Sequence, residues 1–253
     1  MIPKIIHICW LSGDEYPSLT KKCIDSIYAK LPNYEIKIWT KENFDVNSVL
    51  WVKQAFEAKK YAFAADYIRF WSLYNYGGIY LDSDVEVLKS FDDFLDCKSF
   101  MGFEYLNIPE AAVIGAEKGT DWIKSCLGWY DGKSFLTADG GVKNDVVPRL
   151  VKLVLEKKYG KRIEDNGKKQ YFDGLELYPY FYFSPKNYFT AEIKTRAETV
   201  CIHRFVSAWG PDKKRKWTLV VHNIVIHLVG KRMHDRLFRL VRPLPQIFNG
   251  ENI

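Results

Sequence analysis

The chain has 253 residues, of which 47% are hydrophobic and 27% charged, a balance that is ordinary for a soluble globular protein with one sizeable domain. Its formal net charge is +6, but residues 204–242 hold ten of the 37 Lys/Arg residues and only two of the 31 Asp/Glu residues, so the basic excess belongs to the C-terminal part. The five cysteines form no CxxC pair and no stretch reaches the roughly 18 uninterrupted apolar residues of a membrane span, which argues against a zinc site, a disulfide framework and a transmembrane segment.

The N-terminal part alternates between strand and helix patterns. The apolar run at 4–10 predicts a buried strand, and the alternating run at 34–39 predicts a second one. A helix between them begins at Pro17 and Ser18 and runs to about Lys30, and a further helical stretch follows the second strand. This order predicts an α/β fold with a mostly parallel central sheet.

The most informative segment follows. Residues 62–76 (AFAADYIRFWSLYNY) predict a helix that ends at the glycine pair 77–78, with Asp66 and Arg69 on one face. Short strands are expected at 79–81 and 85–87, and two aspartates separate them.

Later elements are less distinct. We expect strands near 99–103, 111–115 and 200–203, and helices near 120–130 and 144–158. The composition changes after Gly210-Pro211, where a basic cluster (DKKRKW) precedes two short amphipathic helical patterns. The sequence therefore predicts a main domain at 1–212 and a basic amphipathic tail at 213–253.

The aspartates Asp82 and Asp84 stand at the end of an apolar strand, where α/β sheets bind ligands. On an extended chain both carboxylates point to one side, and such oxygen ligands suit Mg²⁺ or Mn²⁺ bridging to a diphosphate. For an isolated triplet a polar turn is the commoner interpretation, but the buried approach and the preceding Asp66/Arg69 pair favour a metal site. A phosphatase-type aspartate nucleophile is a weaker alternative, because Glu86 occupies its fifth position.

Three blocks of the sequence resemble glycosyltransferase family 32, the DXD-containing family of capsular polysaccharide transferases and yeast-type mannosyltransferases. They are IPKIIHICW at the start, AFAADYIRFWSLYNYGGIYLDSDVEVL at 62–88 and CIHRFVSAW at 201–209. The resemblance implies a GT-A fold, a nucleotide-sugar-binding domain in which a DXD-bound divalent metal holds the donor. It also implies transfer with retention of the anomeric configuration.

The resemblance also implies roles for individual residues. Asp84 is the expected direct metal ligand, with Asp82 on the ribose or sugar and the metal, and His203 as a further ligand of the metal or the diphosphate. Asp66 and Arg69 are expected to hold donor-sugar hydroxyls, and Trp10 and Tyr80 to lie beside the nucleotide. Ser207 and Trp209 are expected to close over the diphosphate.

Each of these residues also has a structural interpretation. Trp10 could be only a core aromatic, and Tyr80 could face a neighbouring helix. Asp66 and Arg69 could form an idle intrahelical ion pair, although burying one in an apolar helix is costly. A lone His203 would more often be structural. We interpret His7 as structural. Asp139 and Asp145 could line the acceptor side, but we favour a solvated loop for them.

Two departures from the family pattern concern the sugar and acceptor side. Ala111 and Ala112 stand where family members often carry a polar residue, and Val146-Val147-Pro148 replaces the usual Thr-Gly-Pro. No nucleophile is assigned by the sequence. A covalent carboxylate intermediate and a same-face internal return, in which the leaving phosphate deprotonates the acceptor, both remain open.

The leading hypothesis is a Mn²⁺- or Mg²⁺-dependent retaining transferase that moves a hexose from a UDP- or GDP-sugar to a glycan acceptor, as in capsular polysaccharide synthesis. A non-catalytic, membrane-associated scaffold that binds nucleotide-sugars is the alternative. The opening residues lack a signal peptide, and the basic tail suits an anionic membrane surface, so we expect a cytoplasmic protein on the inner face of the membrane. No nucleic-acid partner is expected, and packing of the tail on the main domain is the other possibility.

Overall fold

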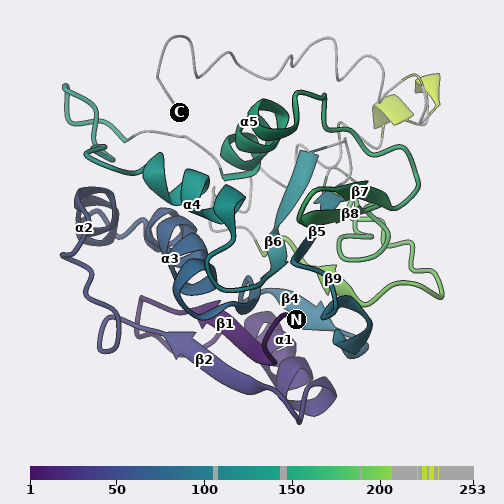
Figure 1. The fold of residues 1–253 in the computed structure, drawn as a ribbon, viewed down its shortest axis with the longest axis horizontal. Coiled ribbons are helices and arrows are strands. Elements are labelled where there is room, and N and C mark those ends of the chain that lie inside the picture. The colour runs from purple at the N-terminus through teal and green to yellow at the C-terminus, as the bar shows by residue number, and fades with distance from the viewer. Residues whose placement is uncertain are drawn as a thin grey trace.

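A computed structural model describes residues 1–104, 108–142, 147–188, 190–206, 221, 224–226, 228–230 and 233. Within these residues the chain builds a seven-stranded sheet in the order β2-β1-β3-β6-β5-β8-β7 (Figure 1). Its strands are β1 (Ile5–Cys9), β2 (Glu35–Trp39), β3 (Gly78–Leu81), β5 (Ser99–Glu104), β6 (Ile108–Ala116), β7 (Gln170–Phe172) and β8 (Leu175–Tyr178).

The pairing makes the sheet mixed but mostly parallel. Strands β2, β1, β3, β5 and β8 run in one direction, whereas β6 and β7 run in the other. The expected α/β class with a mostly parallel sheet is therefore confirmed. The pair β7 and β8 was not predicted, because each strand is short and neither shows a long alternating pattern.

The expected helices also form. They are α1 (Ser18–Lys30), α2 (Leu50–Glu57), α3 (Tyr61–Tyr76), α4 (Asp121–Gly128) and α5 (Val147–Tyr159), with a 3-10 turn η1 (Asp92–Phe94). A separate two-stranded sheet pairs β4 (Val85–Val87) with β9 (Cys201–His203). This pair matters for the site because it joins residues that are more than 100 positions apart in the sequence.

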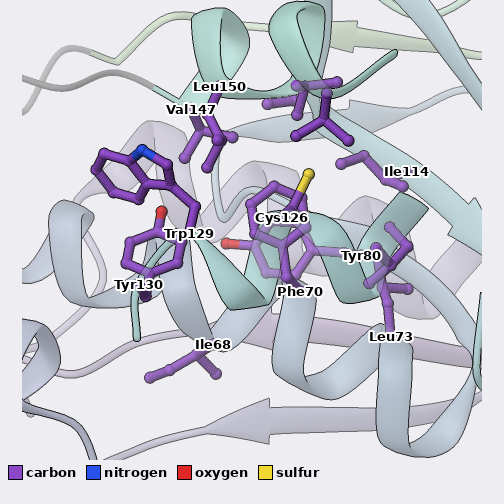
Figure 2. Close-up of a cluster of buried hydrophobic side chains, with 14 of the residues drawn as sticks. Ile68, Phe70, Leu73, Tyr80, Ile114, Cys126, Trp129, Tyr130, Val147 and Leu150 are labelled. Carbon is purple, nitrogen blue, oxygen red and sulfur yellow. The ribbon is translucent and has the colours of Figure 1, made fainter. Parts of the chain in front are cut away.

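The central sheet has a hydrophobic core on each face. Helices α2, α3, α4 and α5 cover one face, and α1 with the β4–β9 pair covers the other. Alternation along β3 divides its residues between the two cores, with Ile79 and Leu81 on one side and Tyr80 on the other. Figure 2 shows the helix-covered core, which includes Ile68, Phe70 and Leu73 of α3, Tyr80 of β3, Ile114 of β6, Cys126 of α4 and Val147 and Leu150 of α5.

The glycine pair after α3 is required by local geometry. Gly77 has φ +68° and Gly78 has φ +108°, a region that L side chains rarely adopt. A Cβ on Gly78 would also lie 2.5 Å from the carbonyl oxygen of Ile5 on the neighbouring strand. The pair thus ends α3 and lets β3 enter the sheet directly beside β1.

The structure describes only a few positions of the C-terminal part, and the expected domain boundary near residue 212 lies outside the described residues. Among the described residues, no helix combines the length and apolar character needed to span a membrane. The apolar side chains of Val221, Ile224 and Leu228, three residues of the first predicted amphipathic pattern, are exposed.

Candidate functional site

Polar side chains gather at one edge of the central sheet. Strands β1, β3 and β5 run in the same direction, so their carboxyl ends meet at this edge, and the antiparallel β6 begins there. Trp10 follows β1, Asp82 follows β3, Glu104 ends β5 and Glu110 lies near the start of β6. The fold therefore brings these residues to the edge where an α/β sheet binds ligands.

The segment that carries the two aspartates is a turn, so the extended geometry expected from the sequence is wrong. Ser83 and Asp84 have turn conformation, and the N–H of Val85 donates to the carbonyl of Asp82 over 3.0 Å. The carboxylates nevertheless converge. One ligand atom each from Asp82, Asp84 and His203 lies within 4.8 Å of the other two. The polar turn and the convergent acid pair, treated as alternatives in the sequence, are the same feature.

Arg69 of α3 links Asp66 of the same helix to Asp82 after β3. Its guanidinium donates to the carboxylate oxygens of Asp66 over 3.1 Å and Asp82 over 3.0 Å, and to the carbonyl of Ala111 over 2.7 Å. It also lies 4.7 Å from the ring centroid of Tyr80, whose hydroxyl donates to the same Asp82 oxygen over 3.0 Å. Asp66 and Arg69 are each 5% exposed, so this is a buried ion cluster that extends beyond the helix.

His203 of β9 links Asp84 to Glu110 of β6. Its Nε2 lies 3.4 Å from Oδ1 of Asp84, and its Nδ1 lies 3.4 Å from the carboxylate of Glu110. His203 reaches Asp84 because β9 pairs with β4, which places it opposite Val85. The backbone N–H of Val206 donates to Oδ2 of Asp84 over 2.7 Å and fixes the turn from the other side.

The pKa values of the three aspartates diverge because each has a different set of neighbours. Burial raises the pKa of Asp66 to about 7 even though Arg69 opposes the shift. Burial likewise raises the pKa of Asp82, against the attraction of Arg69. Burial acts on Asp84 too, but His203 and the N–H of Val206 outweigh it and hold its pKa below the ordinary value.

His203 shows the opposite balance. Burial disfavours its imidazolium, yet Asp84 and Glu110 outweigh that effect and raise the pKa of His203 well above 6.5. Glu110, also buried, has its pKa lowered by His203, whereas burial beside Glu110 raises the pKa of Glu104 to about 8. The imidazole of His203 therefore lies between two carboxylates, those of Asp84 and Glu110.

The donor set of Asp82, Asp84 and His203 fits a divalent ion. Carboxylate oxygens are the ligands that Mn²⁺ and Mg²⁺ prefer, and imidazole is a common ligand of transition metals. The atoms are already grouped, and two converging carboxylates favour a positive charge between them. Asp82, Asp84 and His203 would hold the ion.

The remaining expected residues lie in several places. The ring of Tyr80 is buried against Arg69, and Trp10 is half-buried after β1, its indole N–H donating to the carbonyl of Asp14 over 2.7 Å. His7 is structural as expected, since its Nε2 bonds the carbonyl of Gly77 over 2.7 Å and burial lowers its pKa to about 4. Asp139 lies in an exposed loop, whereas Asp145, Ser207 and Trp209 lie outside the described residues.

The sequence analysis missed Glu110 and Glu104. It noted Ala111 and Ala112 as departures from a family pattern. In the structure their backbone carbonyls contact the site, since that of Ala111 accepts a hydrogen bond from Arg69 and that of Ala112 accepts one from the N–H of Asp82. The available signal was an acid in the otherwise apolar run IPEAAVIGA, because a charge buried in a strand requires a partner.

The comparisons with known proteins agree with this geometry. Residues 17–101 match the family described as the glycosyltransferase sugar-binding region containing the DXD motif, a range that includes Asp66, Arg69, Asp82 and Asp84. Inositol phosphoceramide mannosyltransferase 3 of Schizosaccharomyces pombe is 36% identical over 101 residues, which are 37% of this chain and 27% of that protein. Mannosyl phosphorylinositol ceramide synthase CSH1 of Saccharomyces cerevisiae is 32% identical over 108 residues, 40% of this chain and 28% of that protein. The chain thus matches little more than a quarter of the length of these relatives.

Two solved structures are also similar. The PaToxG glycosyltransferase aligns with a TM-score of 0.47 and 19% identity, over 63% of this chain and 70% of its own. The galactosyltransferase LgtC, solved with donor and acceptor sugar analogues, aligns with a TM-score of 0.42 and 16% identity, over 86% of this chain and 95% of its own. Residues 17–101, with Asp82 and Asp84 as the two aspartates of the motif, are thus similar to the glycosyltransferase sugar-binding region containing the DXD motif.

Proposed function

We propose that the protein is a metal-dependent, retaining glycosyltransferase of the GT-A type, which transfers a hexose from a UDP- or GDP-sugar to an acceptor hydroxyl. The observation that supports this most is the convergence of Asp82 and Asp84, which lie inside the matched region, with His203, which lies outside it, directly beside the Asp66/Arg69 pair. A simple polar turn does not require a buried guanidinium and an imidazole on its two carboxylates.

We propose a role for each of the site residues. Asp82, Asp84 and His203 hold the ion, which supplies charge neutralisation at the diphosphate when bound. Arg69 holds Asp82 in place and adds positive charge near the departing group, and Asp66 accepts hydrogen bonds from donor-sugar hydroxyls. As the family resemblance implies, Trp10 and Tyr80 are proposed for the nucleotide, and Ser207 and Trp209, which lie outside the described residues, for the diphosphate. Pre-organised charge of this kind is a large contributor to catalysis of group transfer.

The acceptor is proposed to be a glycan or a lipid-linked hydroxyl. Capsular or surface polysaccharide synthesis is one setting. The names of the fungal relatives, which describe mannosyl transfer to inositol phosphoceramide, add a mannosyl donor and an inositol phospholipid to the candidates. The basic tail at 213–253 would keep the enzyme on an anionic leaflet, since each Lys or Arg near such a surface contributes about 1 kcal/mol.

The first experiment measures slow hydrolysis of a panel of UDP- and GDP-sugars, with Mn²⁺, with Mg²⁺ and with a chelator. We expect turnover of one donor with a divalent ion, and loss of at least about a hundredfold in Asp84→Asn, because a direct ligand and its charge are removed. Asp139→Asn, in the exposed loop, is the matched control. Hydrolysis by Asp84→Asn at the parent rate would refute the metal assignment.

The same panel separates the alternatives. A phosphohydrolase releases inorganic phosphate from monoesters, whereas the transferase releases nucleoside diphosphate. A scaffold binds the donor, detected as a thermal shift, without turnover on any acceptor. Retention is checked by NMR of the product anomer.

Membrane binding is tested with vesicles. We expect the full chain to sediment with vesicles that contain phosphatidylserine and not with neutral ones, and the interaction to weaken when Lys213, Lys214, Arg215 and Lys216 are replaced by serine. Equal sedimentation of the quadruple variant would show that the basic cluster is not what binds the membrane.

A further inference from the structure

We infer that Glu110 is a positioning residue that holds His203 in the orientation needed for the metal ion, and that an irregularity in β6 is what places it there. This inference rests on the proposed function, because it concerns the same metal site. It adds a residue outside the family match at 17–101 that acts on the ion only through His203.

The orientation of the imidazole is the first step. Nε2 of His203 faces Asp84 at 3.4 Å, so Nε2 is the nitrogen directed towards the two aspartates. Nδ1 is directed the other way, and both carboxylate oxygens of Glu110 lie 3.4 Å from it. Glu110 is therefore placed to accept a hydrogen bond from Nδ1–H, and in that tautomer the lone pair of the neutral ring is on Nε2.

Glu110 is itself held firmly. It is 3% exposed, and its Oε1 accepts the backbone N–H of Ala112 over 2.9 Å. A buried carboxylate in an apolar strand is costly unless it is paired, and His203 is the charged partner that the structure provides.

The strand irregularity explains how β6 reaches the site. The pairing between β5 and β6 jumps from Met101↔Ile114 to Gly102↔Glu110, so the residues between Glu110 and Ile114 have no partner on β5. Their backbone is used by the site, since the carbonyl of Ala111 accepts from Arg69 and the carbonyl of Ala112 accepts from the N–H of Asp82. Bulges of this kind re-aim side chains and are enriched next to active sites.

The chemistry gives the expected effect a size. A carboxylate that accepts the second N–H of a metal-bound histidine fixes its tautomer and raises its basicity, and loss of such a partner typically weakens metal binding about 10–100-fold. Glu104 makes no hydrogen bond or ion pair with His203 among the described residues, although it ends the neighbouring strand. Glu104→Gln is therefore the matched control.

The test measures the dissociation constant of Mn²⁺ alone by EPR of the free ion at pH 7.5, without any sugar donor. We expect Glu110→Met to weaken Mn²⁺ binding about 10–100-fold and Glu110→Gln to weaken it less, because the amide oxygen still accepts from Nδ1. Glu104→Gln should stay within about threefold of the parent, since it removes no hydrogen-bond or ion-pair partner of His203. In a His203→Ala background, Glu110→Gln should have no further effect, because a positioning residue acts only through the ring it positions.

The outcomes are distinct. If the parent binds Mn²⁺ and Asp84→Asn does not, but the Glu110 variants bind as the parent does, Glu110 has no positioning role and the proposed function stands. If Glu110→Gln weakens binding equally with and without His203, Glu110 acts as a bulk charge and the inference is wrong. If Glu110→Met does not fold and Glu110→Gln binds normally, the role is structural and the inference is again wrong. If the parent itself binds no Mn²⁺, or Asp84→Asn binds as well as the parent, the proposed metal site fails first.

Discussion

The contribution of the Arg69 side chain to the stability of the protein can be measured by a single substitution. Replacing it by methionine keeps the length and apolar stem of the side chain but removes three donated hydrogen bonds, to Asp66, Asp82 and the carbonyl of Ala111. Asp66 and Arg69 are each 5% exposed, so water cannot take the place of the guanidinium without opening the structure. Removing one partner of a buried ion pair costs about 3–5 kcal/mol, which for a protein of this size lowers the melting temperature by roughly 6–20 °C.

The destabilisation caused by Arg69→Met should increase with pH. The pKa of Asp66 in the folded protein is raised to about 7 from an ordinary 3.8, so the protonated acid stabilises the fold below about pH 4 and this contribution is lost as the pH rises through 7. Without Arg69 the pKa values of Asp66 and Asp82 rise further. The destabilisation of Arg69→Met, relative to the parent, should therefore be larger at pH 8 than at pH 5.

The assay is chemical and thermal unfolding followed by circular dichroism at both pH values. Arg162→Met is the control, because Arg162 is 78% exposed and pairs with Glu164 at the surface, where a salt bridge contributes about 0–1 kcal/mol. Adding Asp66→Asn to Arg69→Met should recover part of the loss at pH 8. If the free energy of unfolding of Arg69→Met is within about 1 kcal/mol of the parent value at pH 8, Arg69 does not stabilise two buried acids and the reasoning is wrong.

Two further predictions concern single elements of the fold. Gly78→Ala should destabilise the protein by about 2–4 kcal/mol in urea unfolding, since its φ of +108° is strained for alanine and its Cβ would meet the carbonyl of Ile5 at 2.5 Å. Gly13→Ala, with φ +74° and no atom within 4 Å of the added Cβ, should cost only about 1 kcal/mol, and equal costs would contradict the close-approach argument. Asp66→Asn should flatten the stability profile between about pH 4 and 7, because it removes the acid whose raised pKa creates the slope. A variant that keeps the parental slope in the same melting experiment would show that another group titrates there.

The sequence allowed most of the N-terminal half of the fold to be predicted, because its signals are local. The run at 4–10, the helix that begins at Ser18 and the glycine pair after α3 each depend on nearby residues, and the structure places elements there. Strands β7 and β8 escaped prediction for the opposite reason. They are short, and β8 is a strand because it pairs with the distant β5. Pairing over such a separation leaves no local pattern.

The candidate site divides in the same way. Asp82 and Asp84 could be found because a motif marks them, and His203 because a second block resembles the same family. The apolar run around Glu110 marks it as a buried acid but does not identify its partner, because its place beside His203 depends on a jump in strand register. The sequence also suggested an extended aspartate pair, whereas the chain forms a turn whose carboxylates converge through the contacts of Arg69 and His203.

The arrangement of charges explains why this protein can keep four acids beside an apolar core. The guanidinium of Arg69 lies between Asp66 and Asp82, and the imidazole of His203 lies between Asp84 and Glu110. Each cation comes from a different element, α3 or β9, and is shared by two carboxylates, so each of these four acids lies beside a cation. The acid that α3 contributes and the acid that β6 contributes lie on the outer sides, and the two aspartates of the turn lie between the cations. A divalent ion bound by the inner pair would therefore meet carboxylates whose outer neighbours are already fixed, which is the pre-organisation that a metal-assisted transfer needs.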